Sequence, residues 1–293
     1  MPVVDLKGKR VVITGAGRGI GAACARAAAA MGARVVVNDV DEALALEVVH
    51  GIRQAGGQGV AHAADITNWA QAQGLIDRCV SEFGGIDGLV NNAGLFQLAR
   101  IDELTEAGSR AIMEVNVMGT IFCTAHAIRH MLAANDGAIV NITSGAQCGM
   151  AAMGVYGASK GAVASLTYSW AVDLAASAVR VNAVSPMGAT RMGQINQAYN
   201  QARGAPHSPN VIPPENNAPL ICYLLSDASR GIAGQVVRIQ GNRLSLMSHP
   251  AVLEPVQQRA QWTADAIAQA FDDVLAAHAQ PTGVVTVTQQ RSV

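Results

Sequence analysis

A phenol and an ammonium group four residues apart form the pair in this sequence that is best suited to chemistry. They occur as Tyr156-x-x-x-Lys160, inside a helical pattern over 155–176. Residues four apart lie one above the other on a helix face, so the ammonium would favour the phenolate electrostatically. A tyrosine that ordinarily titrates near pH 10 could then serve as a general acid or base closer to neutrality. Taken alone, this spacing is also typical of an exposed helix face.

A hydroxyl group is expected beside this pair. Ser144 follows the strand candidate 138–142, in the stretch Asn141-Ile142-Thr143-Ser144-Gly145. Its side chain would emerge at the carboxyl edge of a sheet, where open α/β sheets bind their ligands. A hydroxyl at this position can hold a substrate carbonyl.

Four glycines are concentrated in T-G-A-G-R-G-I-G, residues 14–21, between a strand candidate and a helical pattern. Side chains at Gly15, Gly19 and Gly21 would obstruct a sharp turn, the approach of the backbone to a pyrophosphate, or the start of the helix. Asp39 ends the next strand candidate, at the separation expected of an acid that accepts hydrogen bonds from an adenosine ribose. The pattern predicts dinucleotide binding.

Asp39 also indicates which dinucleotide binds. A carboxylate would repel the 2′-phosphate of NADP, whereas it can accept hydrogen bonds from both ribose hydroxyls of NAD. Arg18 gives the alternative, because its guanidinium could reach a 2′-phosphate or simply remain solvated. We predict NAD as the cofactor.

The elements that position these residues alternate along the chain. Strand candidates are 10–13, 34–38, 59–63, 88–91, 138–142, 179–184 and 235–239, with helical patterns at 19–31, 41–55, 67–83 and 155–176. This alternation predicts an α/β fold with a doubly wound, Rossmann-type parallel sheet of seven strands in three layers.

The domain organisation follows from the same pattern. Residues 1–250 are predicted to form one dinucleotide-binding and catalytic domain, with a substrate loop at about 187–214. Residues 251–293 form a C-terminal extension, in which we expect a packed helix over 263–278 and a mobile end. The alternating Val284-Val285-Thr286-Val287 leaves an edge strand or an arm to a neighbouring subunit as the alternative.

Composition excludes several other classes of protein. Half of the 293 residues are hydrophobic, 14% are charged and the net charge is −1, so disorder and nucleic-acid binding are not expected. The five cysteines lack metal-ligand spacing, and the N-terminus lacks the apolar core of a signal peptide. We expect a soluble cytoplasmic protein without metal or membrane attachment.

Together these motifs resemble the short-chain dehydrogenase/reductase family over nearly all of residues 5–245. The glycine turn, N-N-A-G at 91–94, V-N-V around Asn116, Ser144, the Tyr156–Lys160 pair and V-N-A-V-S-P at 181–186 occur in the family's order. The resemblance implies that Tyr156 is the acid/base and that Lys160 lowers its pKa and binds the nicotinamide ribose. Ser144 would orient the carbonyl or alcohol, and Asn116 would hold a water in a proton relay.

The resemblance also implies a cofactor cleft in which Asp65 contacts adenine and Thr190 contacts the nicotinamide carboxamide. The residues expected to bind the cofactor are Gly15, Gly17, Arg18, Gly19, Ile20, Gly21, Asp39, Asp65, Ile66, Asn92, Ala93, Gly94, Tyr156, Lys160, Pro186, Gly188 and Thr190. Structural alternatives remain for the catalytic candidate Asn116 and for some of the residues around the cofactor. Asn116 could satisfy backbone groups within a helix, Asp65 could be a helix N-cap, and Asn91 and Asn92 could close an ordinary turn.

The sequence departs from the family pattern in two places near the site. Thr143 stands at the usual distance before the tyrosine and Ser144 is one residue nearer, which we interpret as a deletion within 145–155; Thr143 remains the alternative hydroxyl. The segment after 186, with V-V-N-D at 36–39, is similar to the 3-hydroxyacyl-CoA dehydrogenase part of the peroxisomal multifunctional enzyme type 2.

We therefore predict an enzyme that interconverts a small secondary alcohol and a ketone with NAD, as a homo-oligomer, either tetramer or dimer. The substrate is expected to contact Ser144, Gln147, Met150, Met153, Met187 and Met192. Alternatives are a (3R)-3-hydroxyacyl-CoA dehydrogenase or 3-oxoacyl reductase, and a cofactor-binding regulatory protein without turnover.

Overall fold

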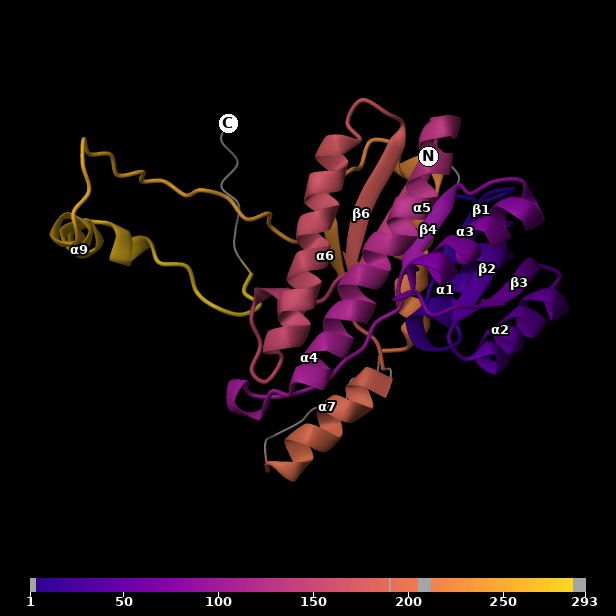
Figure 1. The fold of residues 1–293 in the computed structure, drawn as a ribbon, viewed down its shortest axis with the longest axis horizontal. Helices are drawn as coiled ribbons and strands as arrows, with labels where there is room; N and C mark the ends of the chain where they lie inside the picture. Colours follow the sequence, from indigo (N-terminus) through magenta and orange to yellow (C-terminus); the bar gives the residue numbers. More distant parts are fainter. Residues whose placement is uncertain (1–3, 190, 205–211, 287–293) are drawn as a thin grey trace. The chain divides into compact units, whose positions relative to one another are not determined.

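The computed structural model describes residues 4–189, 191–204 and 212–286 (Figure 1). The chain divides into two compact units, Met1–Met247 and Ser248–Val293. All described strands lie in the first unit, which therefore contains the predicted site.

Short runs rich in β-branched residues form one sheet in the order β3-β2-β1-β4-β5-β6-β7-β8. The strands are β1 (Arg10–Ile13), β2 (Arg34–Asp39), β3 (Gln58–Ala63), β4 (Gly88–Asn91), β5 (Gly137–Ile142), β6 (Val179–Ser185), β7 (Val236–Gln240) and β8 (Arg243–Leu246). Neighbours are parallel up to β7. The strand order reverses between β1 and β4, which is where doubly wound sheets form a ligand crevice. The predicted Rossmann-like fold is confirmed.

The predicted count of seven strands is wrong by one. β8 pairs antiparallel with β7 and places Leu244 opposite Ile239. Its four residues are all exposed, and Leu244 and Leu246 are 64% and 65% exposed. A strand this short, at the edge and without a buried face, has no hydrophobic signal that separates it from a loop.

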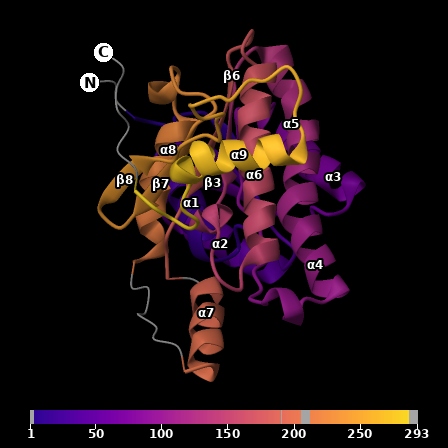
Figure 2. The ribbon, with the colours of Figure 1, turned by 90° about the vertical axis from the view of Figure 1, so that its left-hand side faces the viewer.

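Helices cover both faces of the sheet (Figure 2). The α-helices are α1 (Gly19–Ala30), α2 (Glu42–Gln54), α3 (Trp69–Phe83), α4 (Glu106–Met113), α5 (Gly119–Ala134), α6 (Gly154–Asp173), α7 (Arg191–Ala202), α8 (Ala218–Leu225) and α9 (Ala264–Asp273). Alternate residues of β1 face opposite cores: Val11 and Ile13 pack with α1, α2 and α8, and Val12 packs with α3 and α5. The three layers follow from this alternation.

Short helical turns lie between these elements. They are η1 (Ile101–Glu103), η2 (Glu114–Met118), η3 (Gly145–Cys148), η4 (Pro214–Asn217), η5 (Asp227–Ser229) and η6 (Leu275–His278). η2 is a π-helical turn between α4 and α5, whereas the others are 3₁₀ turns.

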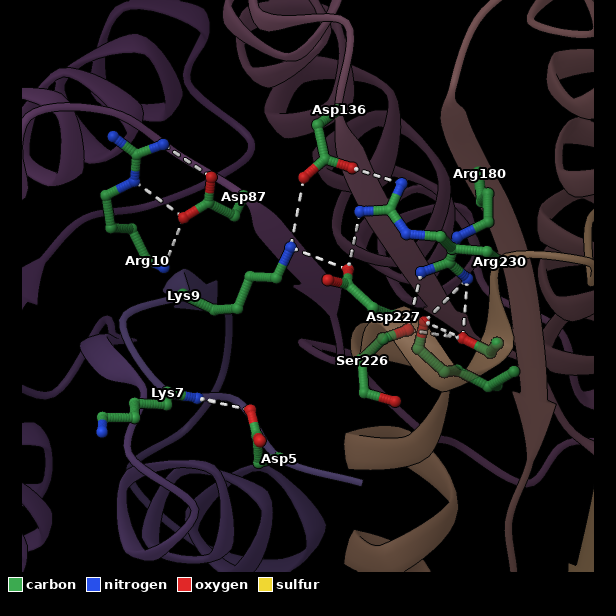
Figure 3. Close-up of polar contacts among 12 residues, drawn as sticks. Asp5, Lys7, Lys9, Arg10, Asp87, Asp136, Arg180, Ser226, Asp227 and Arg230 are labelled. Carbon is green, nitrogen blue, oxygen red and sulfur yellow. Dashed lines mark hydrogen bonds and ion pairs between the residues drawn. The ribbon is translucent and has the colours of Figure 1, made fainter. Parts of the chain in front are cut away.

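Charged side chains tie the strands together at the sheet edge opposite the predicted site (Figure 3). Arg10, at the start of β1, contacts both carboxylate oxygens of Asp87 at 2.7 and 2.6 Å. Lys9 pairs with Asp136 at 3.1 Å and with Asp227 at 2.9 Å. The amino ends of β1, β4 and β5 are thereby held in register, while their carboxyl ends carry the glycine turn and Ser144.

The continuous helical run Glu106–Ala134 is long and apolar enough to span a membrane by length and composition. Half of its most apolar window is buried within the fold. Cys123, Ala127 and Met131 in this run belong to the core beneath the sheet. Such burial is what a core helix of an α/β domain requires.

The second unit contains α9 and η6. Ala270 is the one buried residue of α9, and Ile267 and Phe271 are 46% and 52% exposed. The expected packed helix is therefore formed but is mainly exposed. The alternative of an edge strand over 284–287 is not formed in its described part, because Val284 to Thr286 contain no strand; Val287 lies outside the described residues.

Candidate active site

The carboxyl ends of β4 and β5 and the first turns of α6 bring the predicted chemical group together. Tyr156 and Lys160 are 8% and 3% exposed, so the exposed-face interpretation of their spacing is excluded. The Lys160 Nζ donates a hydrogen bond to the Ile142 carbonyl oxygen at 2.8 Å and lies 5.8 Å from the centroid of the Tyr156 ring. The two side chains share one face of α6, as the spacing predicts.

Burial dominates the protonation of both groups. It raises the pKa of Tyr156, and a side-chain hydrogen bond with Ser144 opposes this shift. It also lowers the pKa of Lys160 from 10.5 to about 8. The expected lowering of the phenol pKa by the ammonium is not found in this structure, because the tyrosine is desolvated and Lys160 is bonded to the backbone of β5.

Ser144 occupies the position expected of a substrate-orienting hydroxyl. It lies beside Tyr156, as their hydrogen bond shows, and its Oγ accepts the Ala146 amide at 3.2 Å. The alternative hydroxyl, Thr143 Oγ1, is buried and donates to the Val184 carbonyl at 3.1 Å. Thr143 therefore joins β5 to β6, which leaves Ser144 as the hydroxyl at the site.

A glycine in α6 allows this close approach. A Cβ added to Gly157 would lie 2.6 Å from the Ala146 carbonyl oxygen of η3. Any larger residue would push η3, and Ser144 with it, away from Tyr156. Gly157 thus sets the spacing between the two groups.

Asn116 lies in the π-helical turn η2 and is 1% exposed. Its Oδ1 accepts the Leu95 amide at 2.7 Å, and its Nδ2 donates to the Leu95 carbonyl and to Ser159 Oγ, both at 3.0 Å. Ser159 Oγ donates to the Tyr156 carbonyl at 2.7 Å. Asn116 is therefore linked to the Tyr156 backbone through Ser159. Its side chain also satisfies the amide and carbonyl groups of Leu95, which is the structural role given as the alternative for this residue.

The glycine turn forms a close-packed cradle between β1 and α1. Gly15 and Gly19 have φ angles of +59° and +57°, which favour glycine. A Cβ at Gly15 would lie 2.7 Å from the Ala93 Cα, and one at Gly21 would meet the Asn92 amide. Asn92 Nδ2 in turn donates to the carbonyl oxygens of Thr14 and Gly15, both at 2.9 Å. The turn therefore leaves backbone, rather than side chains, facing the crevice, which suits a pyrophosphate.

Asp39 borders this cradle at the end of β2. Its Oδ2 accepts the Gly17 amide at 3.0 Å, and its Oδ1 accepts the Asp41 amide at 3.2 Å. A Cβ at Gly17 would lie 2.7 Å from Asp39 Oδ2. Arg18 is exposed. The carboxylate is therefore fixed by the turn itself.

Three more residues predicted to bind the cofactor lie at the same edge of the sheet: Gly94, Pro186 and Gly188. A Cβ at Gly94 would lie 3.3 Å from Asn116 Oδ1 and 3.5 Å from Lys160 Nζ. One at Gly188 would lie 3.8 Å from the Ile20 Cδ1. Pro186 directly follows β6. Gly188 and Ile20 therefore connect the segment after β6 to the glycine turn.

The structure describes three more of the residues predicted to bind the cofactor, but not Thr190. The Ala93 amide donates to Thr14 Oγ1 at 3.0 Å, and Ile66 is buried. Asp65 Oδ1 accepts from the amide and hydroxyl of Thr67 at 2.9 and 2.8 Å. The N-cap of α3 is Asn68, so the N-cap alternative for Asp65 is wrong. Thr190 lies outside the described residues.

The predicted substrate wall is only partly assembled around the tyrosine. Met153 packs in one apolar cluster with Tyr156, Ala146, Phe96 and Leu98. Gln147 Nε2 instead points to Met247 Sδ at 3.8 Å, and Met150 is 48% exposed.

Two other methionines lie on the segment that follows β6. Met187 is bound through its backbone to Asn217, at 3.3 and 3.0 Å, and Met192 lies on α7. Of the four predicted methionines, Met153 is the one in the tyrosine cluster.

Sequence reasoning missed two residues that contact the chemical group. Phe96 packs edge-on against Tyr156, with ring centroids 4.8 Å apart. Ser159 links Asn116 to Tyr156. Phe96 follows N-N-A-G by two residues, and an aromatic residue there in an otherwise aromatic-poor chain is a usable signal. Ser159 carries no such signal, because a serine in an alanine-rich helix is indistinguishable from a surface residue.

A parallel sheet, a glycine cradle at its crevice and a buried Ser/Tyr/Lys group together define a nucleotide-dependent oxidoreductase scaffold. A family model described as enoyl-(acyl carrier protein) reductase matches residues 15–241. The chain belongs to the short-chain dehydrogenase/reductase family, whose dehydrogenases use a nicotinamide cofactor.

Individual relatives agree with this assignment. The chain is 42% identical over 236 residues to a cis-4-hydroxycyclohexanecarboxylate dehydrogenase of Sinomonas cyclohexanicum, covering 78% of this chain and 94% of the relative. It is 32% identical over 250 residues to a 3-oxoacyl-[acyl-carrier-protein] reductase of Thermotoga maritima, covering 80% and 98%. A short-chain dehydrogenase structure from Mycobacterium avium superposes with a TM-score of 0.82 at 32% identity, covering 96% of this chain and 98% of that one.

Proposed function

We propose that this protein oxidises a compact secondary alcohol to a ketone, and reduces the ketone, with NAD(H) as cofactor. The observation that carries the proposal is the placement of Ser144 beside the buried Tyr156, with Lys160 on the same helix face and the glycine cradle at the same sheet edge. Family membership supports the reaction type.

The chain's own groups would bind, orient and move a proton. During oxidation the phenolate form of Tyr156 accepts the proton of the alcohol on its Oη, and during reduction the phenol returns this proton to the carbonyl oxygen. Ser144 Oγ hydrogen-bonds the same substrate oxygen and fixes its orientation. The nicotinamide of the bound cofactor supplies the hydride acceptor or donor. Phe96 and Met153 exclude water from the tyrosine, so that the proton is exchanged with substrate in a desolvated site.

The residues of the glycine turn fit a dinucleotide that carries a free ribose. Asp39 is held against Gly17 by a hydrogen bond of 3.0 Å, so its carboxylate stays where the adenosine ribose of a dinucleotide is expected. A 2′-phosphate there would face a fixed negative charge. This supports NAD over NADP.

The proposed substrate is compact, and the Sinomonas relative supports this size class because the substrate in its name is a single-ring hydroxy acid. The wall near the tyrosine is formed by Phe96, Leu98 and Met153, which suits an apolar ring. Phosphate groups of a large acyl carrier need basic docking residues. Two arginines lie at the ends of α7: Arg191 is its first residue, and Arg203, directly after it, is already paired with Glu103 at 2.6 Å.

A second candidate is the oxidation of 3-hydroxyacyl thioesters. The Thermotoga relative and the family model favour it, since both names refer to an acyl carrier protein. A kinetic comparison of 3-hydroxybutyryl-CoA with 4-hydroxycyclohexanecarboxylate and small aryl alcohols, at saturating NAD, separates the candidates. A kcat/KM at least about tenfold higher for the thioester, worth about 1.4 kcal/mol, would select the second candidate.

The reaction itself is tested by Tyr156→Phe, which removes the proton-transferring hydroxyl and keeps the ring. We expect turnover to fall about 10²–10⁴-fold while the Kd for NAD changes little. Turnover within about threefold of the wild type would remove Tyr156 from the mechanism. Normal NAD binding without oxidation of any alcohol by the wild type would instead support a cofactor-binding regulatory protein.

A further inference from the structure

A second polar group lies on the face of the sheet that α6 covers, further along the sheet from the catalytic residues. Ala183 of β6 and Val236 of β7 pack in one cluster with Ala164 of α6. Side chains two residues apart on a strand share a face, so Ser185 and Arg238 also point to the α6 side. These two residues are paired in register across β6 and β7. They therefore lie on the side of the sheet where α6 carries the acid/base.

Arg238 carries a charge that the fold leaves unpaired. The residue is half-buried, its Nη1 donates to Ser185 Oγ at 3.1 Å, and its Nη2 donates to Gln240 Oε1 at 3.4 Å. Both acceptors are neutral, and no carboxylate of the described residues forms an ion pair with this guanidinium. A half-buried cation without a counter-ion favours an anionic ligand, because the strongest hydrogen bonds of a guanidinium are those to a carboxylate or a phosphate.

The Gln147 side chain reaches the same part of the sheet and also lacks strong partners. Gln147 lies in η3, just after Ser144, and its Nε2 donates to the Met247 Sδ at 3.8 Å. Its Oε1 is buried and has no hydrogen-bond partner among the described residues. Met247 lies beside β7, because its amide donates to the Val236 carbonyl at 2.8 Å. A thioether is a weak acceptor, so a ligand carboxylate is a better acceptor for the Gln147 amide group.

The spacing of the strands places Arg238 within reach of a compact substrate. The Thr143 amide donates to the Val184 carbonyl at 2.8 Å, so the next residues, Ser144 and Ser185, lie at the same level of neighbouring strands. Neighbouring strands are about 4.8 Å apart, and the guanidinium reaches back to Ser185 on β6. It therefore lies roughly one strand spacing from the chain that carries Ser144. A small substrate whose alcohol oxygen is at Ser144 can present a second polar group to Arg238.

We propose that Arg238 binds a carboxylate of the substrate, with Gln147 as a second donor, and that the substrate is a compact hydroxy acid. The acid binds at Arg238 and the alcohol at Ser144 and Tyr156, so the substrate is held at both ends and its orientation is fixed. The hydroxy-acid class rests on the proposed alcohol oxidoreduction, whereas binding of the carboxylate does not.

The direct test is the binding of cyclohexanecarboxylate, which carries the acid but has no alcohol to oxidise. Calorimetric titration in the presence of NADH compares the wild type with Arg238→Gln, which keeps hydrogen-bond donors but loses the charge. We expect the Kd to rise about tenfold or more in Arg238→Gln and to recover in part in Arg238→Lys, which restores the charge without the planar fork.

The control is Arg230→Gln, which makes the same change of charge at the opposite edge of the sheet (Figure 3). There Arg230 pairs with Asp227 at 3.1 Å. We expect its Kd for cyclohexanecarboxylate to equal that of the wild type. An equal Kd in the wild type and Arg238→Gln, or an equal rise in Arg230→Gln, would overturn the carboxylate site.

Kinetics with matched substrates give a second readout, which does not depend on the folding of a variant. 4-Hydroxycyclohexanecarboxylate and its methyl ester share the ring and the alcohol but differ in charge. At saturating NAD we expect the wild type to show a kcat/KM at least about tenfold higher for the acid, mainly through KM, and Arg238→Gln to lose most of this preference. A methyl ester that is used as well as the acid would overturn the hydroxy-acid class. If no alcohol is oxidised, the proposed function fails and the binding data still decide the carboxylate site.

Discussion

Replacing the buried Lys160 by methionine is expected to stabilise the protein while it destroys activity. The ordinary pKa of a lysine is 10.5, and burial lowers the pKa of Lys160 to about 8 because it disfavours the charged form. At pH 7 the buried ammonium therefore lowers the free energy of unfolding by roughly 3 kcal/mol, at about 1.4 kcal/mol per pH unit. Loss of the hydrogen bond to the Ile142 carbonyl offsets about 1 kcal/mol. We expect Lys160→Met to be about 2 kcal/mol more stable at pH 7.

The pH dependence identifies the cause. Because the folded pKa lies below the unfolded one, the unfolded chain binds more protons between pH 8 and 10.5. The penalty is complete below pH 8 and disappears as the pH approaches 10.5, so the advantage of Lys160→Met should shrink by roughly 2 kcal/mol between pH 7 and pH 10. Urea unfolding of both proteins at the two pH values measures this, with Lys7→Met as an exposed control. A stability difference that is the same at both pH values would refute the reasoning.

Three further predictions concern the geometry of the site. Asp39→Ala should narrow the preference for NAD over NADP, measured as the ratio of kcat/KM values; equal use of both cofactors by the wild type would contradict the role of the carboxylate. Ser144→Ala should lower kcat/KM about 10²-fold or more, whereas Thr143→Ala should act mainly on the melting temperature; the reverse ranking would exchange their roles. Gly157→Ala should reduce kcat by displacing η3, while Gly161→Ala, with open space around its Cβ, should stabilise α6 by about 0.5–1 kcal/mol; equal activity of the two variants would refute the spacing argument.

The sequence was sufficient for the parallel strands β1 to β7 and for the residues at their carboxyl ends. Parallel strands buried on both faces produce continuous apolar runs, and the functional groups follow those runs directly, as Ser144 follows β5. The glycine turn at residues 14–21 could be predicted in the same way, because its close packing requires glycine at defined positions. Local pattern thus predicted that Tyr156 and Lys160 lie together on one face of α6 and that Asp39 lies at the end of β2.

Other features depend on contacts that no local pattern encodes. Glu103 and Arg203 are 100 residues apart, so their pairing becomes visible only when β6 has placed α7. The phenol pKa depends on how completely the fold excludes water from Tyr156, and a four-residue spacing contains no information on desolvation. β8 lacks a buried face, and the π-helical turn lacks any residue type that distinguishes it from α-helix.

The π-helical turn η2 interrupts the α-helical register of the run Glu106–Ala134. A π-helical turn accommodates one more residue than an α-helical turn, and η2 places this extra residue at Glu114–Met118, around Asn116. The faces of α4 and α5 are therefore out of phase by about 100°, one residue's rotation about a helix axis. Deleting a single residue here would let the run close into uninterrupted α-helix and turn α4 relative to α5. Insertions or deletions in this turn should consequently lower the activity of the enzyme far more than most substitutions. Homologous chains are expected to keep the length of the turn even where its residues differ.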